Sequence, residues 1–303
     1  MQIIEQTTLF KLSGRSAVAI GKFDGIHLGH QALIHRITEQ KNRGLTAVVF
    51  TFDTSASAFF GGETEELTTR AEKRRIFEQM GVDVLIEFPL NAGTAATEPE
   101  EFVHTYLAKQ MRTAYICAGS DLSFGKKGAG DYALLARYAR EHDYQVELID
   151  KVVIEGDEVS STRVREAVRR GEMESVSRML GMPYSVSGRV EHGMRLGRTI
   201  GMPTANLLPE PDKLLPPNGV YYARVSIGEK DYKGISNVGC KPTVSDEKVM
   251  GVETYLYDFD GDLYGREISV QLLAFRRPEI KFDSVESLKA QLAEDIAAGE
   301  AFL

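Results

Sequence analysis

The pattern of hydrophobic and polar residues changes once along the 303-residue chain, near residue 183. From residue 16 to about 150, short β-branched and aromatic runs alternate with stretches whose apolar residues recur at helical spacing. This rhythm predicts a parallel sheet covered by helices. After residue 183, short strand-like segments alternate with turns, as in an antiparallel barrel or sandwich. We therefore expect two domains, residues 1–182 and 183–303, which the chain length also favours.

The same pattern and the local end signals predict individual elements. In the first half, strands are expected at residues 17–20, 45–52, 84–88 and 114–118. Thr69 with Glu72, and Thr97 with Glu100, have the spacing of capping boxes that open helices. In the second half, the pattern predicts a capped helix after Ser284, hairpin turns at 228–231 and 260–262, and strands at residues 184–190, 220–227, 232–238, 252–258 and 268–275.

Composition and charge narrow the class of protein. With 43% hydrophobic and 26% charged residues the chain is typical of soluble globular proteins. It has neither a membrane-length apolar run nor a signal peptide, so we expect a cytoplasmic protein with no membrane partner. A net charge of −8 argues against nucleic acid as a partner. Cys117 and Cys240 are too few and too far apart for a disulfide framework or a zinc finger, and both are expected to be packed thiols.

Residues 21–30 carry the strongest chemical signal in the first half. Their glycines let the backbone approach a ligand closely, and the helix that follows offers unpaired N–H groups to an anion. His27 and His30 lie at this positive end, where two imidazoles suit a polyphosphate whose charge develops as a bond breaks. A cap or a surface position is the ordinary alternative for each histidine. A metal-binding pair is a second alternative, but the sequence offers no third ligand at metal-ligand spacing.

Two later segments of the first half also suit ligand binding. Residues 119–131 are rich in glycine and long for a connection, with a mobile surface loop as the alternative. At residues 159–165, three successive hydroxyls stand at a helix entry and are followed by Arg163 and Arg165. One hydroxyl suffices for a cap, and the two arginines add forks suited to phosphate.

The pattern G-x-F-D-G-x-H-x-G-H at residues 21–30 resembles the H-x-G-H nucleotidyltransferase superfamily, and most closely the bacterial bifunctional riboflavin kinase/FMN adenylyltransferase (FAD synthetase) family. Residues 159–165 resemble its I-S-S-T-R-I-R motif, and residues 119–131 resemble its G-x-D-F-x-F-G…G-D segment. The resemblance implies a Rossmann-like α/β nucleotidyltransferase domain in which His27 and His30 stabilise transition-state charge. It also implies flavin contacts from Asp121 and Phe124, and ATP contacts from Gly21, Phe23, Asp24, Gly25, His27, His30, Ser160, Ser161, Thr162, Arg163 and Arg165.

Three departures from the family pattern occur in this half. Lys22 stands where asparagine is commoner, and a cation there is compatible with phosphate. Leu122 replaces a usual aromatic residue, which removes a stacking ring, and residues 51–56 lack the Pro-His-Pro-like segment of many members.

In the second half, residues 188–206 combine glycines with basic side chains and end in Pro-Thr-Ala-Asn. Such a segment can wrap a polyphosphate, and Thr204 and Asn206 are hard oxygen ligands suited to Mg²⁺, with a generic hairpin as the alternative. The whole segment resembles the riboflavin kinase signature G-R-V…G…G-R-x-x-G-x-P-T-A-N, with Met202 for the usual phenylalanine. The resemblance implies an antiparallel β-barrel closed by an α-helix, Mg²⁺ held by Thr204 and Asn206, and kinase ATP contacts from Gly188, Gly197, Arg198, Gly201, Thr204 and Asn206.

Two further segments match the kinase half of the family. Residues 237–243 resemble its N-I-G-x-R-P-T turn, with Lys241 for arginine. Glu253 lies in a strand-like run, where a glutamate more often faces solvent. By resemblance it is the carboxylate that takes the proton from the riboflavin 5′-hydroxyl, a role that its chemistry fits.

The resemblance therefore implies FAD biosynthesis in two ATP-dependent steps, from riboflavin to FMN and from FMN to FAD and pyrophosphate. Riboflavin, FMN, FAD and ATP are the expected small-molecule partners, and the sequence leaves homo-oligomerisation open. Two alternatives are an enzyme with only one working domain and a flavin-sensing protein that lost the chemistry. The joint retention of seven residues argues against both: His27, His30, Ser161, Thr162, Thr204, Asn206 and Glu253.

Overall fold

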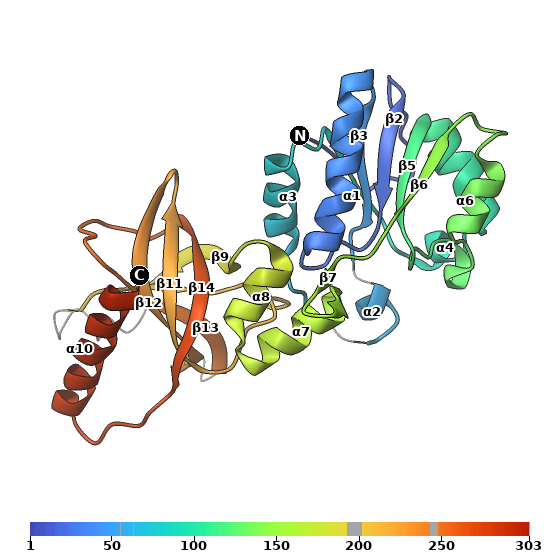
Figure 1. Cartoon of the computed structure of the whole chain (residues 1–303). Coiled ribbons are helices and arrows are strands. Elements are labelled where there is room, and N and C mark those ends of the chain that lie inside the picture. The colour runs from blue at the N-terminus through green and yellow to red at the C-terminus, as the bar shows by residue number, and fades with distance from the viewer. Residues whose placement is uncertain (55, 63, 193–201, 243–247, 303) are drawn as a thin grey trace. The chain divides into compact units, whose positions relative to one another are not determined.

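The structure is a computed structural model that describes residues 1–54, 56–62, 64–192, 202–242 and 248–302. The chain divides into two compact units, Met1–Ser160 and Ser161–Leu303 (Figure 1). The expected boundary after residue 182 concerns the division of function and stays a prediction. Among the described residues, no helix combines the length and the apolar character needed to cross a membrane.

The first unit is built on a six-stranded parallel sheet with the order β1-β4-β3-β2-β5-β6. Its strands are β1 (Gln2–Glu5), β2 (Ser16–Ile20), β3 (Thr46–Phe52), β4 (Val84–Phe88), β5 (Thr113–Gly119) and β6 (Gln145–Ile149). Around them lie α1 (Leu28–Glu39), η1 (Gln40–Arg43), α2 (Ala56–Phe59), α3 (Arg70–Gln79), α4 (Ala92–Ala95), α5 (Pro99–Glu101), η2 (Phe102–Gln110), η3 (Lys126–Gly128) and α6 (Tyr132–Tyr138). A small hairpin, β7 (Val153–Ile154) with β8 (Asp157–Glu158), follows β6. The predicted parallel α/β fold is confirmed.

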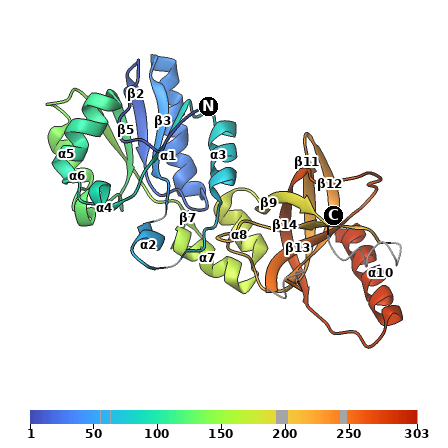
Figure 2. The ribbon, with the colours of Figure 1, turned by 180° about the vertical axis from the view of Figure 1, so that it is seen from behind.

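The central strands are buried on both faces, as parallel strands between helix layers must be. One face packs against apolar side chains of η2, including Phe102, Val103 and Leu107. The α1 helix buries Leu33 and Ile34 and contacts β2, β3 and β5. Figure 2 shows the same layers from behind.

One of the two expected capping boxes is confirmed. Thr69 accepts a hydrogen bond from the Glu72 N–H, and the Glu72 side chain accepts one from the Thr69 N–H. The second box is wrong, because α5 begins at Pro99 with Glu98 as its N-cap and has no side-chain cap. Proline favours the first helical position, which moves the start past Thr97.

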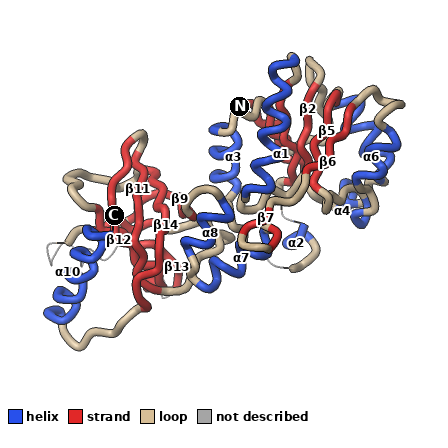
Figure 3. Tube along the Cα trace, viewed as in Figure 1, coloured by secondary structure: helices blue, strands red, loops and turns tan. Residues whose placement is uncertain are grey.

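The second unit begins with two helices and continues as a closed antiparallel barrel with the strand order β10-β13-β12-β11-β14-β9 (Figure 3). The helices are α7 (Ser161–Arg170), α8 (Met173–Leu180) and the C-terminal α10 (Val285–Phe302). The strands are β9 (Tyr184–Glu191), β10 (Thr204–Leu207), β11 (Gly219–Ile227), β12 (Lys230–Pro242), β13 (Lys248–Leu256) and β14 (Glu267–Pro278). The predicted barrel with a closing helix is confirmed, and Ser284 Oγ accepts the expected capping bond from Ser287 N at 3.1 Å.

Two local expectations about the second half are wrong. Residues 260–262 do not turn a hairpin, because β13 pairs with β10 and β12 while β14 pairs with β11 and β9. Cys117 is buried as expected, but Cys240 is exposed, near the end of β12 beyond the buried Val238. Both cysteines are free.

Candidate functional site

The loops after β2 and β5 stand where the strand order of the first sheet reverses. From β2 the chain moves outward to β3 and β4, and it then returns to β5 on the other side of β2. Open parallel sheets bind ligands at the carboxyl ends of their strands at such a switch point. The segment 21–30 follows β2, and the segment 119–131 follows β5. The topology thus places two of the predicted motifs at one edge of the sheet.

The backbone of the loop after β2 is tightly wound. Phe23, Gly25 and Ile26 have positive φ angles of 50°, 83° and 44°. The Gly25 N–H donates to Thr68 Oγ1 at 2.7 Å, so the loop is tied to the segment that precedes α3. Of the three, only glycine adopts this conformation without steric cost, and the strain at Phe23 and Ile26 is of the kind found at ligand-binding sites.

The other predicted ATP-contacting residues of this loop have structural partners. Phe23 is fully buried, with its ring 5.2 Å from that of His30 and 5.6 Å from that of Phe77, measured between centroids. Asp24 Oδ1 accepts the Leu67 N–H at 2.8 Å. Gly21 donates its N–H to Phe50 O at 3.2 Å. These residues shape the loop, and their contacts with ATP stay a prediction.

His27 and His30 form a stacked pair at the start of α1. Their ring centroids are 3.8 Å apart with an angle of 19° between the planes. His27 is the N-cap, and its Nδ1 accepts the His30 N–H at 3.4 Å. An accepting Nδ1 carries no proton, so the proton of the neutral His27 ring is on Nε2, which is then a donor.

Burial makes both rings poor bases. It lowers the pKa of His27 to about 4, against a smaller opposing effect of the Asp121 carboxylate. The pKa of His30 falls well below its usual value because of burial, with further lowering by His27 and by the Lys73 ammonium. Both imidazoles are therefore neutral at pH 7 and act as hydrogen-bonding groups rather than as fixed cations.

His30 has an unsatisfied atom in this arrangement. Its Nδ1 is buried and finds no hydrogen-bond partner among the described residues. Buried polar atoms in native proteins are nearly always paired. An orphaned ring nitrogen at a helix N-terminus is therefore a polar atom that a bound ligand can satisfy.

The two predicted flavin-contacting residues lie in different surroundings. Asp121 is exposed, and its charge acts on His27, so the structure brings these two residues to the same edge of the sheet. Phe124 is buried in the core, with its ring 5.2 Å from that of Phe102. Gly125 has a φ of 69°, and a Cβ there would lie 2.8 Å from the Pro99 Cα. This part of the loop is packed, and the flavin contacts of both residues stay a prediction.

The hydroxyl and arginine segment opens helix α7. Val159 is buried, and Ser160, Ser161, Arg163 and Arg165 are partly exposed, while Thr162 is exposed. The polar side chains of this helix entry are therefore partly or fully exposed. Their predicted grip on the ATP polyphosphate stays a prediction.

In the barrel, the predicted catalytic and metal-binding residues come together on two neighbouring strands. Asn206 of β10 is paired with Glu253 of β13, and Thr204 is paired with Tyr255. Thr204 and Asn206 alternate with the buried Ala205 and Leu207, so the two oxygen-bearing side chains share one face. The Thr204 hydroxyl donates to Glu253 Oε1 at 2.6 Å.

Two cavities of the barrel unit meet at this polar group. One, of about 570 Å³, is lined by Thr204, Glu253 and Tyr255 together with apolar side chains of β11, β12 and α10, and by the charged residues Arg277, Glu279, Lys281 and Asp295. The other, of about 800 Å³, is lined by Thr204, Asn206 and Tyr255 together with the acidic loop 258–262. Because of these linings, the first cavity suits an apolar ring system and the second suits a polar ligand. Thr204 and Tyr255 line both cavities, so the hydroxyl of Thr204 lies at their border.

The remaining predicted kinase residues divide into two groups. Gly188 lies in β9, where a Cβ would come within 2.9 Å of Leu208 O, so this glycine permits close strand packing. Gly197, Arg198 and Gly201 lie outside the described residues.

The donor set at Thr204 and Asn206 fits a magnesium ion. A hydroxyl and an amide carbonyl are hard oxygen ligands, and the Glu253 carboxylate lies within hydrogen-bond distance of the hydroxyl. No thiol or imidazole stands among the described residues that line either cavity, so the chemistry favours Mg²⁺ over a softer ion.

Sequence reasoning missed residues that share these sites. Tyr255 of β13 lines the first cavity and was not predicted. Asn237 of β12, which the sequence placed only in a family turn motif, lines the same cavity and is paired with Glu253 of β13. The two-residue period of a strand would have placed Tyr255 on the face of Glu253. Lys73 lies in the first turn of α3, and its charge lowers the pKa of His30. Nothing in the sequence indicated that this lysine lies near His30.

Comparisons with known proteins agree with both halves. The family model of FAD synthetase matches residues 10–163, and that of riboflavin kinase matches residues 180–303. The bifunctional riboflavin kinase/FMN adenylyltransferase of Listeria monocytogenes is 36% identical over 94% of this chain and 91% of its own, and the protein of that name from Escherichia coli K12 is 36% identical over 92% and 90%.

A third relative and a solved structure extend the likeness to nearly the whole chain. The Pseudomonas fluorescens protein of the same name is 33% identical over 99% of this chain and 97% of its own. A solved structure from Streptococcus pneumoniae, described as a macrolide-efflux protein, is 32% identical with a TM-score of 0.86 and covers 96% of this chain and 95% of that one. The chain therefore belongs to the family of bifunctional riboflavin kinase/FMN adenylyltransferases, enzymes that make FAD from riboflavin by way of FMN.

Proposed function

We propose that the barrel unit forms FMN at Thr204, Asn206 and Glu253, and that the loop of His27 and His30 serves the transfer of an adenylyl group to that FMN. The observation that carries the first assignment is the 2.6 Å hydrogen bond from the Thr204 hydroxyl to Glu253 at the border of the two cavities. We also assign the enzyme to the cytoplasm, where ATP for both reactions is abundant.

In the kinase reaction, the 5′-hydroxyl oxygen of riboflavin forms a bond to the γ-phosphorus of ATP while the bond to the β,γ-bridging oxygen breaks and ADP leaves. Glu253 accepts the hydroxyl proton, as a carboxylate next to the reacting hydroxyl can. The apolar cavity holds the flavin ring, and Thr204 and Asn206 orient the phosphate end. Bound Mg²⁺ would be held by Thr204 and Asn206 and would neutralise phosphate charge.

In the adenylyl transfer, an oxygen of the FMN phosphate forms a bond to the α-phosphorus of ATP, and pyrophosphate leaves. The attacking phosphate oxygen is already an anion, so no general base is needed. Neutral His27 and His30 donate hydrogen bonds to oxygens that gain charge in the transition state, and the N-terminus of α1 adds its partial positive charge. The contribution of Ser160 to Arg165 is to hold the polyphosphate.

Chromatographic separation of flavins after incubation with riboflavin, ATP and Mg²⁺ tests the two assignments. His30→Ala should accumulate FMN and lower FAD formation by about a hundredfold or more, the usual cost of losing a preorganised transition-state donor. His35→Ala, an exposed position on the same helix, is the control. Loss of both activities in His30→Ala would contradict the assignment.

The reciprocal variant is Glu253→Ala. It should lower FMN formation from riboflavin by about a hundredfold or more, as loss of a general base does, and should still convert added FMN to FAD. Glu267→Ala, at the exposed start of β14, is its control. A Glu253→Ala protein that phosphorylates riboflavin at the wild-type rate would remove Glu253 from the mechanism.

A further inference from the structure

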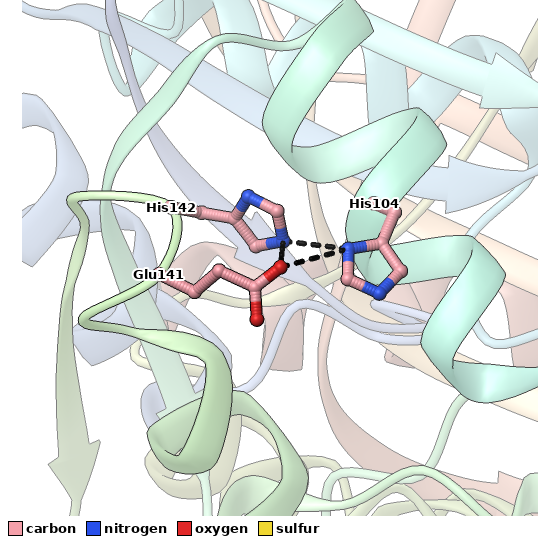
Figure 4. A group of neighbouring side chains, drawn as sticks. All are labelled: His104, Glu141 and His142. Atoms are coloured by element: carbon pink, nitrogen blue, oxygen red, sulfur yellow. Dashed lines mark hydrogen bonds and ion pairs between the residues drawn. The ribbon is translucent and has the colours of Figure 1, made fainter.

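Three side chains with metal-binding chemistry meet in the first unit, at residues assigned to neither reaction. His104 lies in η2, and Glu141 and His142 lie in the turn between α6 and β6 (Figure 4). His104 Nδ1 and His142 Nε2 are 2.6 Å apart. Glu141 Oε1 lies 3.6 Å from the same nitrogen of His142 and 3.9 Å from the same nitrogen of His104. Among the described residues, this is the group of three or more such ligands that comes together.

The three atoms that face one another are all electron-pair donors. When both rings are neutral, one nitrogen can donate a proton to the other, which accounts for the contact between the histidines. The carboxylate oxygen then faces two nitrogens whose only shared proton is already used. A cation at the meeting point satisfies all three atoms at once, which a hydrogen bond between the rings alone does not.

The spacing is close to that of a tetrahedral metal site. With metal–ligand bonds of roughly 2.0–2.1 Å, ligand atoms lie about 3.3 Å apart. The two distances to Glu141 exceed this value by a few tenths of an ångström, and the Glu141 side chain is 59% exposed and free to rotate inward. The two nitrogens need to separate by about 0.7 Å to reach the same spacing, a small rotation of two rings.

The two rings are already held in place by their surroundings. The His104 ring packs edge-on against Tyr138, with centroids 4.9 Å apart, and the His142 ring stacks with that of Tyr144, with centroids 6.4 Å apart. The backbone N–H of His142 donates to the backbone oxygen of Tyr138 at 3.1 Å, which fixes the turn. Tyr144, next to this turn, is fixed by the hydrogen bond of its hydroxyl to Leu135 O at 2.8 Å. Preordered ligands lose little entropy on binding. His104 also lies in a π-helical segment, a type of helix that is frequent at functional sites.

We propose that His104, Glu141 and His142 bind a divalent first-row transition metal ion, with Zn²⁺ as the probe. Two imidazoles and one carboxylate are the donor set of many three-ligand zinc sites, whereas Mg²⁺ prefers oxygen ligands alone. With side-chain exposures of 35% for His104 and 18% for His142, the ion is reached from solvent and completes its coordination with water. The bound ion links η2 to the turn after α6 and so stabilises the first unit.

The test titrates Zn²⁺ into untagged, chelator-treated full-length protein, with a competing chromogenic chelator as the readout. The wild type should bind Zn²⁺ in the presence of excess Mg²⁺. His104→Ala, His142→Ala and Glu141→Gln should each weaken this binding by about tenfold or more, and His35→Ala, an exposed histidine of α1, should not. Absence of Zn²⁺ binding by the wild type, or equal binding by wild type and all three ligand variants, would overturn the proposal.

Two additions make the result specific to this site. The same titration with a His27→Ala/His30→Ala protein should still show Zn²⁺ binding, because this change removes the other histidine pair and leaves the proposed ligands intact. Loss of binding in that protein would mean that the metal binds at the H-x-G-H loop and would overturn the proposal. Co²⁺ should give the intense visible absorption of tetrahedral coordination, and Glu141→Gln, which preserves side-chain shape, should lose it. Unchanged conversion of FMN to FAD by each ligand variant, with ATP and Mg²⁺ but without Zn²⁺, shows that the first unit is folded.

Discussion

His27 and His30 illustrate how a buried helix start sets the protonation of its side chains. Stacking places two rings 3.8 Å apart, and both are shielded from water, so a second positive charge there is strongly disfavoured. The rings are thereby kept as neutral donors until a polyphosphate arrives. The negative charge of that ligand raises both pKa values again, so binding and protonation are coupled.

The lowered pKa of His27 predicts how the stability of the ligand-free protein depends on pH. The pKa of His27 is lowered from 6.5 to about 4, so between these values the unfolded chain binds a proton that the folded protein does not. The free energy of unfolding therefore rises by about 3 kcal/mol as the pH increases from the folded-state pKa of His27 to its unfolded-state pKa. The same stability is lost when the pH falls through this interval. Denaturant unfolding at several pH values should show a shallower rise for His27→Gln than for the wild type.

The matched control for this prediction is His35→Gln, since His35 is exposed on the same helix. Its pH profile should follow that of the wild type. Identical slopes for wild type and His27→Gln between pH 4 and 6.5 would show that His27 is not held neutral by burial.

The predictability of the site from sequence also differs residue by residue. The position of Thr204 and Asn206 on the same face of β10 follows from strand geometry alone. The hydrogen bond from Thr204 to Glu253 does not, because it depends on which strand β10 pairs with. The cluster of His104 with residues 141–142 also depends on a contact between distant parts of the chain and could not be predicted from the sequence. Residues 104 and 141 are 37 positions apart, and no local spacing links them.

Elements were predicted well where the signal is local. The strand at residues 84–88 has the bounds of β4, and the Thr69 capping box opens α3 as expected. The failures lie where a competing local rule or a distant partner decides. Pro99 fixed the start of α5, and the partners of β13 and β14 in the closed barrel made residues 260–262 a connection between strands that are not neighbours.

At the scale of elements, α10 is joined to the barrel by one buried carboxylate. Asp295 is fully buried and binds Arg276 Nε at 2.7 Å and Arg277 Nη2 at 2.5 Å, both on β14. The same helix lends Leu288, Leu292 and Ile296 to the apolar cavity next to Glu253. The ion pairs therefore hold one wall of the proposed flavin site in place.

Asp295→Ala should destabilise the barrel unit by about 3 kcal/mol, because removing one partner of a buried ion pair leaves the other without compensation. The variant should also raise the KM for riboflavin more than it lowers kcat, since it displaces a binding wall and not the reacting groups. Urea unfolding and steady-state phosphorylation measure the two effects. Glu294→Gln, the exposed neighbour, is the control, and an unchanged riboflavin KM in Asp295→Ala would show that α10 does not shape the site.

At the scale of the whole molecule, two reactions that share FMN are assigned to two different sites, with the kinase residues and the histidine loop in different compact units. The residues of the proposed kinase site all lie in Ser161–Leu303, and the histidine loop lies in Met1–Ser160. FMN is a water-soluble phosphate anion, and a product that leaves one site in free form is available to any other molecule in solution. The bifunctional chain then gains no obligatory transfer from the covalent linkage.

Mixing the two variants that each lack one activity tests this directly. His30→Ala makes FMN but not FAD, and Glu253→Ala uses FMN but does not make it, so neither alone should form FAD from riboflavin. Their mixture should form FAD after a lag that ends once free FMN has accumulated, and the lag should lengthen on dilution because FMN accumulates more slowly.

A mixture that accumulates FMN without FAD, while Glu253→Ala still converts added FMN, would contradict free exchange and mean that FMN stays bound within one chain. A mixture without a lag would mean that the variants associate and pass FMN directly, since release into bulk solution requires time for the intermediate to build up.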